Sequence, residues 1–482
     1  VGGDLVNDDS LGGGTFRFNG GSVANRGVIE SMGSTAMVAN SLVNSGTLHA
    51  GTGGSIQVTQ GLVNDGGRLS AMDGLSIVTG ASLSNRAGRI LAGGDLGVQV
   101  VGDRRGGGLI AANGQLQVRA GGGLELAEGG AGRSASLSAD GGHLTIGSPF
   151  AADGQLSLAG RDGVATEALS AGGALSVTSA QGRVVTGGLA AVGPLTVVAA
   201  GDATVLGPAV SDGAVSLSAG AGLSVGSTLA SGEAASLSGA AVRVNGPILV
   251  EGALTADAGT AGLILAGEVR TGAGVLLKGR QVSASGVLTA GRIAVHAGAD
   301  GFDNSGSLVG NTGVDVASLG AVVQQGVVAS QGNVSLAAGR DLSLSGDVEA
   351  GGNLALRSAE RIVAGGAWWS AGALEARAGQ SLDNTRDVLA GGAVNLTADT
   401  GALTFGGRVA ANGALHLKAG GALAAGAVSG GLEKGETVSV EAGGNVSLAQ
   451  VLAGGDYLAR AGGDYRANGV SLVVGNLDLA AV

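Results

Sequence analysis

The 482-residue sequence contains no cysteine, which excludes a disulfide framework, a thiolate metal site and a cysteine nucleophile. It also has only 4 prolines and 2% aromatic residues. Ordinary globular cores use large aromatic side chains to fill irregular space, whereas the 44% hydrophobic content here is mostly Ala, Val and Leu. Small side chains of this kind suit a narrow, repetitive interior.

Basic surfaces and long apolar runs are also missing. The formal net charge is −11 and the isoelectric point about 4.8, so no face that would attract nucleic acid or anionic lipid is expected. No run of about 18 apolar residues could span a bilayer, and residues 1–15 lack the basic and apolar parts of a signal peptide. We therefore expect no nucleic-acid binding and no membrane insertion.

Glycine, in contrast, is abundant, with 99 residues. Collagen is excluded because there is no Gly-X-Y period and proline is scarce. Disorder is excluded because the mean hydropathy of +0.38 is too apolar for a chain that stays solvated. The apolar residues must therefore be buried in a regular structure that tolerates glycine.

A short repeat runs through the chain. Segments of the form Gly-x-Leu/Val-x-Leu/Val recur from Gly154 to Gly413 with a mean spacing of about 20 residues, and the spacing drifts most around Gly274 and Gly291. Apolar and small polar residues alternate within each segment, as in residues 215–218. Such alternation is the period of a strand with one buried face.

Glycines separate these segments. Many belong to Asn-Gly or Asp-Gly pairs, for example those that end at Gly114, Gly154, Gly213 and Gly413. A chain that turns every few residues needs corners, and such pairs are typical of corners with positive φ. We therefore expect positive φ at these glycines.

Three short strands with corners between them fill about 20 residues, so each repeat is predicted to form one coil paired in parallel with the next at about 4.8 Å. The predicted fold is an all-β parallel β-solenoid of roughly 24 coils that continues over residues 1–482. Within it, a recurring Asn identifies the coils of residues 1–110, and the Gly-x-Leu-x-Leu pattern identifies those of residues 111–435. The coils of residues 436–482 are less regular. Because both ends lack polar capping segments, we expect a fragment of a longer protein.

Asparagine supplies the most regular polar signal. The first five markers follow one another at intervals of about one repeat, and two later markers are separated by four repeats. Asparagines stacked in successive coils can donate and accept amide hydrogen bonds along the axis, whereas a preference for turns alone would not fix the spacing. A partial ladder is therefore predicted from Asn7, Asn25, Asn44, Asn64, Asn85, Asn304 and Asn384.

The text LVNSGTLHA at residues 42–50, AGRDLSL at 338–344 and LAGGAVNL at 389–396 resembles the haemagglutinin repeats of two-partner-secretion exoproteins. That family includes filamentous haemagglutinin, matrix adhesins, haemolysins and contact-dependent growth-inhibition proteins, and the resemblance covers most of the chain. It implies a right-handed parallel β-helix, export through a partner outer-membrane transporter, and a place at the surface of a Gram-negative bacterium.

The sequence also departs from that family. It has no NPNG-type segment of a secretion domain, no Arg-Gly-Asp tripeptide and no carboxy-terminal toxin module. The predicted function is therefore the structural shaft of a secreted filamentous adhesin, whose other parts would contact host-cell receptors, glycans or other bacterial cells. The stick of a contact-dependent growth-inhibition toxin is the alternative.

A polysaccharide-active β-helix enzyme is a third, less favoured hypothesis. Such an enzyme needs carboxylates about 5–10 Å apart. Asp8-Asp9 is the only adjacent acidic pair, and a strand would point its members to opposite faces. Turn chemistry explains the aspartates in or near corners, which are Asp162, Asp202, Asp341 and Asp387.

The histidines follow no ligand spacing. They are widely separated in the sequence, so neighbouring coils would not bring any two of them together. The four are His49, His143, His296 and His416. We therefore predict no catalytic residue, no cofactor and no metal site.

Trp368-Trp369 is unusual in a chain so poor in aromatics. If the pair lies in a strand, one indole faces outward, where it could stack on a sugar ring or a neighbouring protein. The interpretation favoured from sequence is that both lie at a bulged corner and pack against the next coil.

Overall fold

The computed structural model describes residues 2–431 and 436–482, which form β-strands joined by short corners. No described residue is helical, so this part of the chain offers no helix that could cross a membrane. The chain divides into two compact units, Val1–Gly239 and Ala240–Val482. Both units are parallel β-solenoids, in agreement with the predicted fold class.

The first unit holds strands of two to five residues. They are β1 (Leu5–Asn7), β2 (Ser10–Gly13), β3 (Phe16–Asn19), β4 (Val23–Asn25), β5 (Val28–Ser31), β6 (Thr35–Ala39), β7 (Leu42–Asn44), β8 (Thr47–Ala50), β9 (Gly54–Val58), β10 (Leu62–Val63), β11 (Arg68–Ala71), β12 (Leu75–Thr79), β13 (Leu83–Ser84), β14 (Arg89–Ala92), β15 (Leu96–Val100), β16 (Arg104–Arg105), β17 (Leu109–Ala112), β18 (Leu116–Ala120), β19 (Leu124–Leu126), β20 (Glu128–Ala131), β21 (Ala135–Ala139), β22 (His143–Ile146), β23 (Phe150–Ala152), β24 (Leu156–Gly160), β25 (Gly163–Thr166), β26 (Leu169–Ala171), β27 (Leu175–Ser179), β28 (Arg183–Thr186), β29 (Leu189–Ala191), β30 (Leu195–Ala199), β31 (Ala203–Val205), β32 (Ala209–Ser211), β33 (Val215–Ala219), β34 (Gly222–Val225), β35 (Leu229–Ser231) and β36 (Ala235–Ser238).

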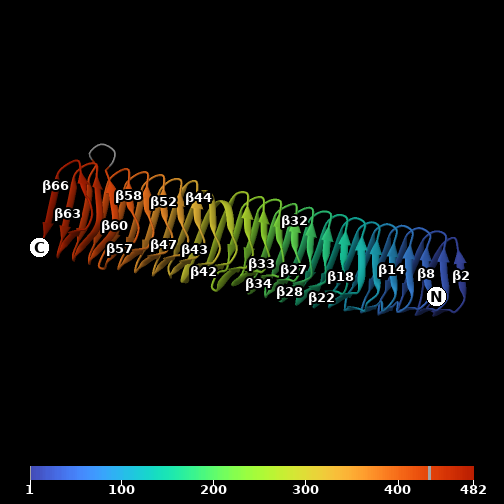
Figure 1. The fold of residues 1–482 in the computed structure, drawn as a ribbon. Helices are drawn as coiled ribbons and strands as arrows, with labels where there is room; N and C mark the ends of the chain where they lie inside the picture. Colours follow the sequence, from blue (N-terminus) through green and yellow to red (C-terminus); the bar gives the residue numbers. More distant parts are fainter. Residues whose placement is uncertain (1, 432–435) are drawn as a thin grey trace. The chain divides into compact units, whose positions relative to one another are not determined.

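Three consecutive strands of this unit make one coil. Each strand pairs in parallel with the strand three places later, so β27 pairs with β30, β28 with β31 and β29 with β32 (Figure 1). The offset between paired residues ranges from 18, for Leu5 with Val23, to 21, for Leu62 with Leu83. The predicted repeat is thus the length of one coil.

The second unit holds strands of two to seventeen residues. They are β37 (Ala241–Val244), β38 (Ile248–Val250), β39 (Leu254–Asp257), β40 (Gly262–Leu265), β41 (Val269–Thr271), β42 (Gly274–Ala284), β43 (Leu288–Asn304), β44 (Leu308–Ser318), β45 (Val322–Gln324), β46 (Val328–Ser330), β47 (Asn333–Ala338), β48 (Leu342–Leu344), β49 (Val348–Ala350), β50 (Leu354–Ser358), β51 (Ile362–Ala364), β52 (Trp368–Ser370), β53 (Leu374–Ala378), β54 (Leu382–Asn384), β55 (Val388–Ala390), β56 (Val394–Ala398), β57 (Leu403–Phe405), β58 (Val409–Ala411), β59 (Leu415–Ala419), β60 (Leu423–Gly430), β61 (Val438–Ala442), β62 (Val446–Ala453), β63 (Tyr457–Ala461), β64 (Tyr465–Ala467), β65 (Leu472–Val473) and β66 (Leu477–Ala481).

The coils of the second unit pair in the same way, but β42, β43, β44, β60 and β62 continue through corners and each pairs with more than one strand of a neighbouring coil. In β42, β43 and β44 the pairing register shifts between Gly279 and Gln281 and again between Ala290 and Arg292. The first shift inserts two residues into β43 and the second inserts one residue into β44, and the stack continues past both. These shifts lie where the sequence period drifts.

The core of each unit is a stack of aligned aliphatic columns. Side chains alternate inward and outward along each strand, and inward positions in successive coils lie opposite one another, as Leu156, Leu175 and Leu195 do. All three are almost completely buried. The alternating pattern in the sequence therefore identified the buried face correctly.

Glycine at the corners has a different role from the one predicted. Positive φ occurs at a few described glycines, such as Gly66, but not at the four expected to have it, which are Gly114, Gly154, Gly213 and Gly413. Instead, a Cβ on Gly114 would collide with the Oδ1 of Asp95, and a Cβ on Gly366 would collide with the carbonyl oxygen of Gly346. Glycine is needed at these two corners because consecutive coils approach too closely for a side chain.

Candidate functional site

The predicted asparagine ladder is present in the first unit. Asn7, Asn25 and Asn44 end strands β1, β4 and β7, and the next two markers directly follow β10 and β13. The Nδ2 of each asparagine donates to the Oδ1 of the next, over 2.7, 2.7, 2.6 and 2.7 Å. All five side chains are buried. The ladder formed by Asn7, Asn25, Asn44, Asn64 and Asn85 is thus confirmed.

The second amide proton of each ladder residue goes to the backbone. The Nδ2 of Asn44, for example, also contacts the carbonyl oxygens of Gly46 at 3.1 Å and Arg68 at 3.2 Å. These bonds matter because an amide buried without partners costs several kcal/mol, roughly 2–7 depending on the reference state. The ladder therefore satisfies a polar column inside an otherwise aliphatic core.

Arg104 ends the ladder. In the coil after Asn85, Gly106 takes the asparagine position, and Arg104 occupies a core position that is leucine in both neighbouring coils. Arg104 is fully buried and its Nη1 donates to the carbonyl oxygen of Gly106 over 2.8 Å. Its Nε and Nη2 have no partner among the described residues. Burial lowers the pKa of Arg104 from its ordinary value to about 10, although the charge of Glu125 acts in the opposite direction.

The two later asparagines do not extend the ladder. Asn304 donates to the Oε1 of Gln324 in the next coil over 2.8 Å. Asn384 shares the column but lies between Ala364 and Phe405, and its Nδ2 has no partner among the described residues. The predicted column is therefore correct for Asn304 and Asn384, whereas a bond from one asparagine to another is not formed at either.

Many corner Asp and Asn side chains bind the next coil. We call this contact a corner clamp: an Oδ1 accepts a hydrogen bond from a backbone N–H 18 to 21 residues later, over 2.6 to 3.2 Å. The acceptors are Asp4, Asp65, Asp95, Asp103, Asp202, Asn333, Asp341, Asp347, Asn353, Asp387, Asn445 and Asp456.

Most of the Asp and Asn residues that accept a corner clamp directly precede a strand. At that position the next coil presents a backbone N–H that the strand pairing leaves free. Sequence reasoning assigned Asp202, Asp341 and Asp387 to turn chemistry within their own corners. The structure shows that each of them links two coils. Clamp partners recur at the coil period, and that spacing was the signal that could have revealed them.

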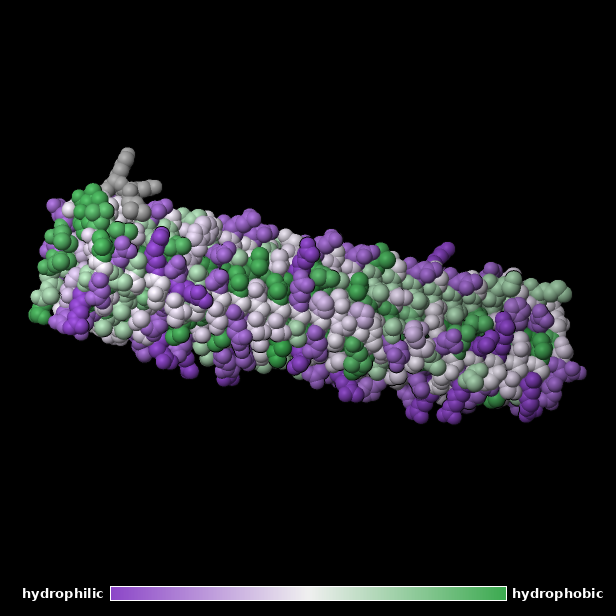
Figure 2. All heavy atoms as spheres, in the orientation of Figure 1, coloured by the Kyte–Doolittle hydropathy of each residue, from purple (hydrophilic) through white to green (hydrophobic). Residues whose placement is uncertain are grey.

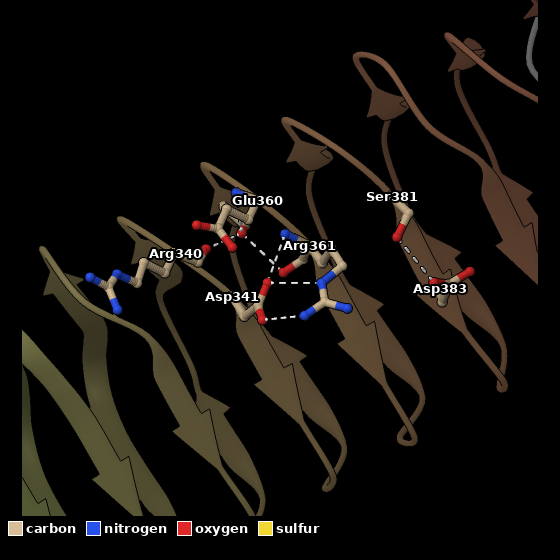
Figure 3. Close-up of polar contacts among 7 residues, drawn as sticks. Arg340, Asp341, Glu360, Arg361, Ser381 and Asp383 are labelled. Atoms are coloured by element: carbon tan, nitrogen blue, oxygen red, sulfur yellow. Dashed lines mark hydrogen bonds and ion pairs between the residues drawn. The ribbon is translucent and has the colours of Figure 1, made fainter.

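The clamp at Asp341 also carries an ion pair. Asp341 accepts from the backbone N–H of Arg361 at 3.2 Å, from its Nε at 3.2 Å and from its Nη2 at 2.8 Å, as the two side chains reach across adjacent coils (Figure 3). The side-chain hydrogen bond from Arg361 is the main reason why the pKa of Asp341 lies below its ordinary value, and Asp341 in turn raises the pKa of Arg361. A carboxylate held in this way is poorly suited to accept a proton.

The other acidic and histidine residues that the structure describes form no metal-binding cluster. Asp8 pairs with Arg26 across adjacent coils at 2.8 Å, and His49 contacts Ser70 at 2.9 Å. Within residues 2–431 and 436–482, no group of three His, Asp or Glu side chains is placed to hold a metal ion.

The tryptophan pair lies in a strand, so the bulged-corner interpretation is wrong. In β52, Trp368 points inward and is fully buried, whereas Trp369 points outward and is 45% exposed. The Trp368 ring packs edge-on against Phe405 with centroids 6.5 Å apart. The sequence alone could not decide between the two interpretations, because a corner would also have accommodated two consecutive bulky residues.

Trp369 borders a shallow hollow on the outer face of the second unit. The hollow has a volume of about 310 Å³ and crosses the coils of β44, β46, β49 and β52. Its lining includes Asn311, Gln331, Glu349 and Trp369. Most of the visible outer surface is pale or purple, with hydrophobic residues in small separate groups (Figure 2). An exposed indole beside several polar side chains is the arrangement that best fits a ligand.

Comparison of the chain with models of known protein families, with curated proteins and with solved structures gave no match. Function is therefore inferred from the residues and their geometry.

Proposed function

We propose that the chain is a structural shaft segment of a secreted, cell-surface filament of the filamentous-haemagglutinin type. The observation that carries this proposal is that successive sequence repeats form successive coils of the stack. Leu42 pairs with Leu62, and the side chain of Asn44 donates to that of Asn64, so equivalent residues of successive repeats lie one above the other. Each coil presents similar strand edges to the coils before and after it, so further coils can be added to the stack. The number of repeats in the sequence therefore sets the length of the solenoid.

The second support is the use of the polar side chains. The ladder, the corner clamps and ion pairs such as Asp341–Arg361 connect one coil to the next. Side chains committed to holding coils together are those of a load-transmitting element rather than of a reaction centre. We propose that the two units form one continuous shaft, and that adhesive or toxic modules belong to other parts of the protein.

Export through a partner outer-membrane transporter and display at a Gram-negative surface belong to the same proposal. They are supported by the repeat text and by the absence of cysteine, which suits a chain exported unfolded through an oxidising compartment. A host-cell adhesin, a matrix adhesin and the stick of a growth-inhibition toxin would share this shaft.

Electron microscopy of the purified chain tests the proposal. At about 4.8 Å per coil and roughly 24 coils, a continuous shaft should appear as a thin rod on the order of 115 Å long. Particles of similar length and width, or two separate bodies at variable angles, would contradict it. Protease accessibility of the full-length protein on intact cells, with and without its transporter, would test surface display.

A further inference from the structure

The hollow beside Trp369 follows the coil axis of the second unit. Val309, Ala329, Glu349 and Trp369 occupy the same outward position in four successive coils, because each is paired in register with the next. Asn311, Gln331 and Gly351 line the hollow along one side. Its floor is therefore a row of outward side chains with a step of about 4.8 Å.

The backbone of Trp369 is fixed at one end of this row. Its neighbour Trp368 is fully buried, and the strand is paired on both sides, with β49 and with β55. The strand that carries the exposed indole therefore needs no ordering when a ligand stacks on it. The electron-rich face of an indole attracts the C–H groups on the apolar face of a pyranose ring.

The polar groups of the hollow are available to a ligand. Asn311, Gln331 and Glu349 are exposed, and among the described residues their side chains have no hydrogen-bond or ion-pair partner. This differs from Glu375 in β53, the strand that follows Trp369, because the carboxylate of Glu375 is paired with Arg357 at 3.2 Å. Amides donate to and accept from hydroxyl groups, and a carboxylate accepts from them.

The charge of the hollow selects against acidic sugars. Glu349 is its one ionisable lining residue, and no Lys, Arg or His lines it among the described residues. An uronic or sialic acid would meet this carboxylate without a compensating cation. A neutral, hydroxyl-rich ligand meets an aromatic platform and three hydrogen-bonding side chains.

We propose that this hollow is a binding site for a neutral glycan, with one pyranose ring stacked on Trp369 and the following sugars extended along the axis over Glu349 and Gln331. The step between coils is close to the length of one sugar in an extended chain, so successive sugars meet successive coils. The site would give the shaft a lateral contact with polysaccharide, separate from any adhesive tip. It does not depend on the proposed family or route of export.

Calorimetric titration of the full chain with neutral β-linked gluco-, manno- and N-acetylglucosamine oligosaccharides tests this proposal, with polygalacturonate fragments as the acidic comparison. At least one neutral series should bind, and affinity should increase with length up to about four sugars. Trp369→Ala should weaken binding about tenfold or more, since each tenfold corresponds to about 1.4 kcal/mol and a stacked aromatic contributes on that scale. Glu349→Ala should weaken it several-fold.

The matched control is Leu249→Ala. Leu249 occupies the same outward column several coils earlier and is 44% exposed, almost the same as Trp369. Its removal should leave glycan affinity unchanged, and thermal melting should show all variants folded. Trp369→Leu separates stacking from general apolar contact, because leucine keeps an apolar surface and lacks the aromatic face.

Several outcomes would overturn the proposal. They are absence of binding to every neutral series, equal binding by Trp369→Ala and the unsubstituted chain, and preference for the acidic fragments. Full affinity in Trp369→Leu would also reject it, since that result would make the hollow a general apolar contact. Loss of binding confined to Trp369→Ala, Trp369→Leu and Glu349→Ala would support it.

Discussion

At the scale of single residues, the stability of the first unit depends on an unbroken ladder of amides. Asn44 donates to Asn64 and accepts from Asn25. Loss of its side chain therefore leaves the Nδ2 of Asn25 and the Oδ1 of Asn64 buried without their partner in the ladder. We predict that Asn44→Ala lowers the free energy of unfolding by about 2–4 kcal/mol, because two buried groups each lose a partner. Urea unfolding followed by circular dichroism measures this.

Asn7→Ala is the internal control for that prediction. Asn7 begins the ladder and donates to Asn25 without accepting from another asparagine. It is also slightly more exposed than the others. Its replacement should cost clearly less than that of Asn44, and equal losses at the two positions would argue against cooperative linkage along the ladder.

Arg104 should weaken the fold at neutral pH. It is buried at a leucine position, and two of its three guanidinium nitrogens have no partner among the described residues. We predict that Arg104→Met is as stable as the unsubstituted chain or more stable, by about 1–4 kcal/mol, because an unpaired buried charge is removed at similar volume. Leu124→Met, one coil later, is the packing control.

The pH dependence of this difference is the sharper measurement. The pKa of Arg104 is about 10 in the folded chain, below that of the free side chain, so the folded state binds fewer protons than the unfolded state at pH values between the two. The unsubstituted chain therefore gains stability as pH rises through 10. The advantage of Arg104→Met should shrink between pH 9 and pH 11, and a constant advantage would contradict the burial of a charged guanidinium.

The five residues of the ladder share one property, which is an asparagine one period away in the same column. The ladder from Asn7 to Asn85 was predictable for that reason. Gln324 and Arg104 were missed because each differs in type from the residue it follows in its column. Periodicity predicts which residues share a column. It does not predict the partner of a residue that differs in type from its neighbours in that column, because packing between coils determines that partner.

At the scale of corners and strands, the corner clamps predict that side-chain length and acceptor chemistry matter more than charge. Asp347 accepts from the backbone N–H of Ala367 over 2.8 Å, and Ala367 offers no side chain that could replace this contact. We predict that Asp347→Ala costs about 0.5–1.5 kcal/mol. Asp347→Asn should cost much less, because Asn333 and Asn353 make the same clamp elsewhere.

Thermal melting of the two Asp347 variants at low and high salt separates the hydrogen bond from electrostatics. The clamp predicts a melting temperature that falls for Asp347→Ala at both salt concentrations. A loss of equal size in Asp347→Asn that disappears at high salt would instead indicate a purely ionic role.

The carboxylates at the corners also lead to a prediction about chemistry. Asp341 is held by three N–H donors from Arg361, and its pKa is lowered, so it is not poised as a general acid. We predict no hydrolase or lyase activity of the purified chain on polyuronates. Turnover that persists through purification and disappears when one acidic residue is changed would contradict this.

Corners were the least predictable elements. The sequence located them by their glycines but assigned those glycines to positive φ, whereas at Gly114 the requirement is the closeness of the preceding coil. The close contact at Gly114 joins two residues that lie about one repeat apart and differ in type, Gly114 and Asp95, so a rule based on neighbouring residues in the sequence does not predict it. The strands were predictable because alternation is local.

At the scale of the molecule, the central claim is that one repeat is one coil, and paired deletions test it most directly. Residues 173–192 span one coil, since Gly173 and Leu175 stand opposite Gly193 and Leu195. Deleting them should leave a folded chain that melts close to the unsubstituted protein and is shorter by about one strand spacing, roughly 4.8 Å, in solution scattering. Deleting only residues 173–182 joins mismatched positions and should lower the melting temperature sharply, because strand pairing is interrupted inside the stack. Equal damage from the two deletions would contradict the account.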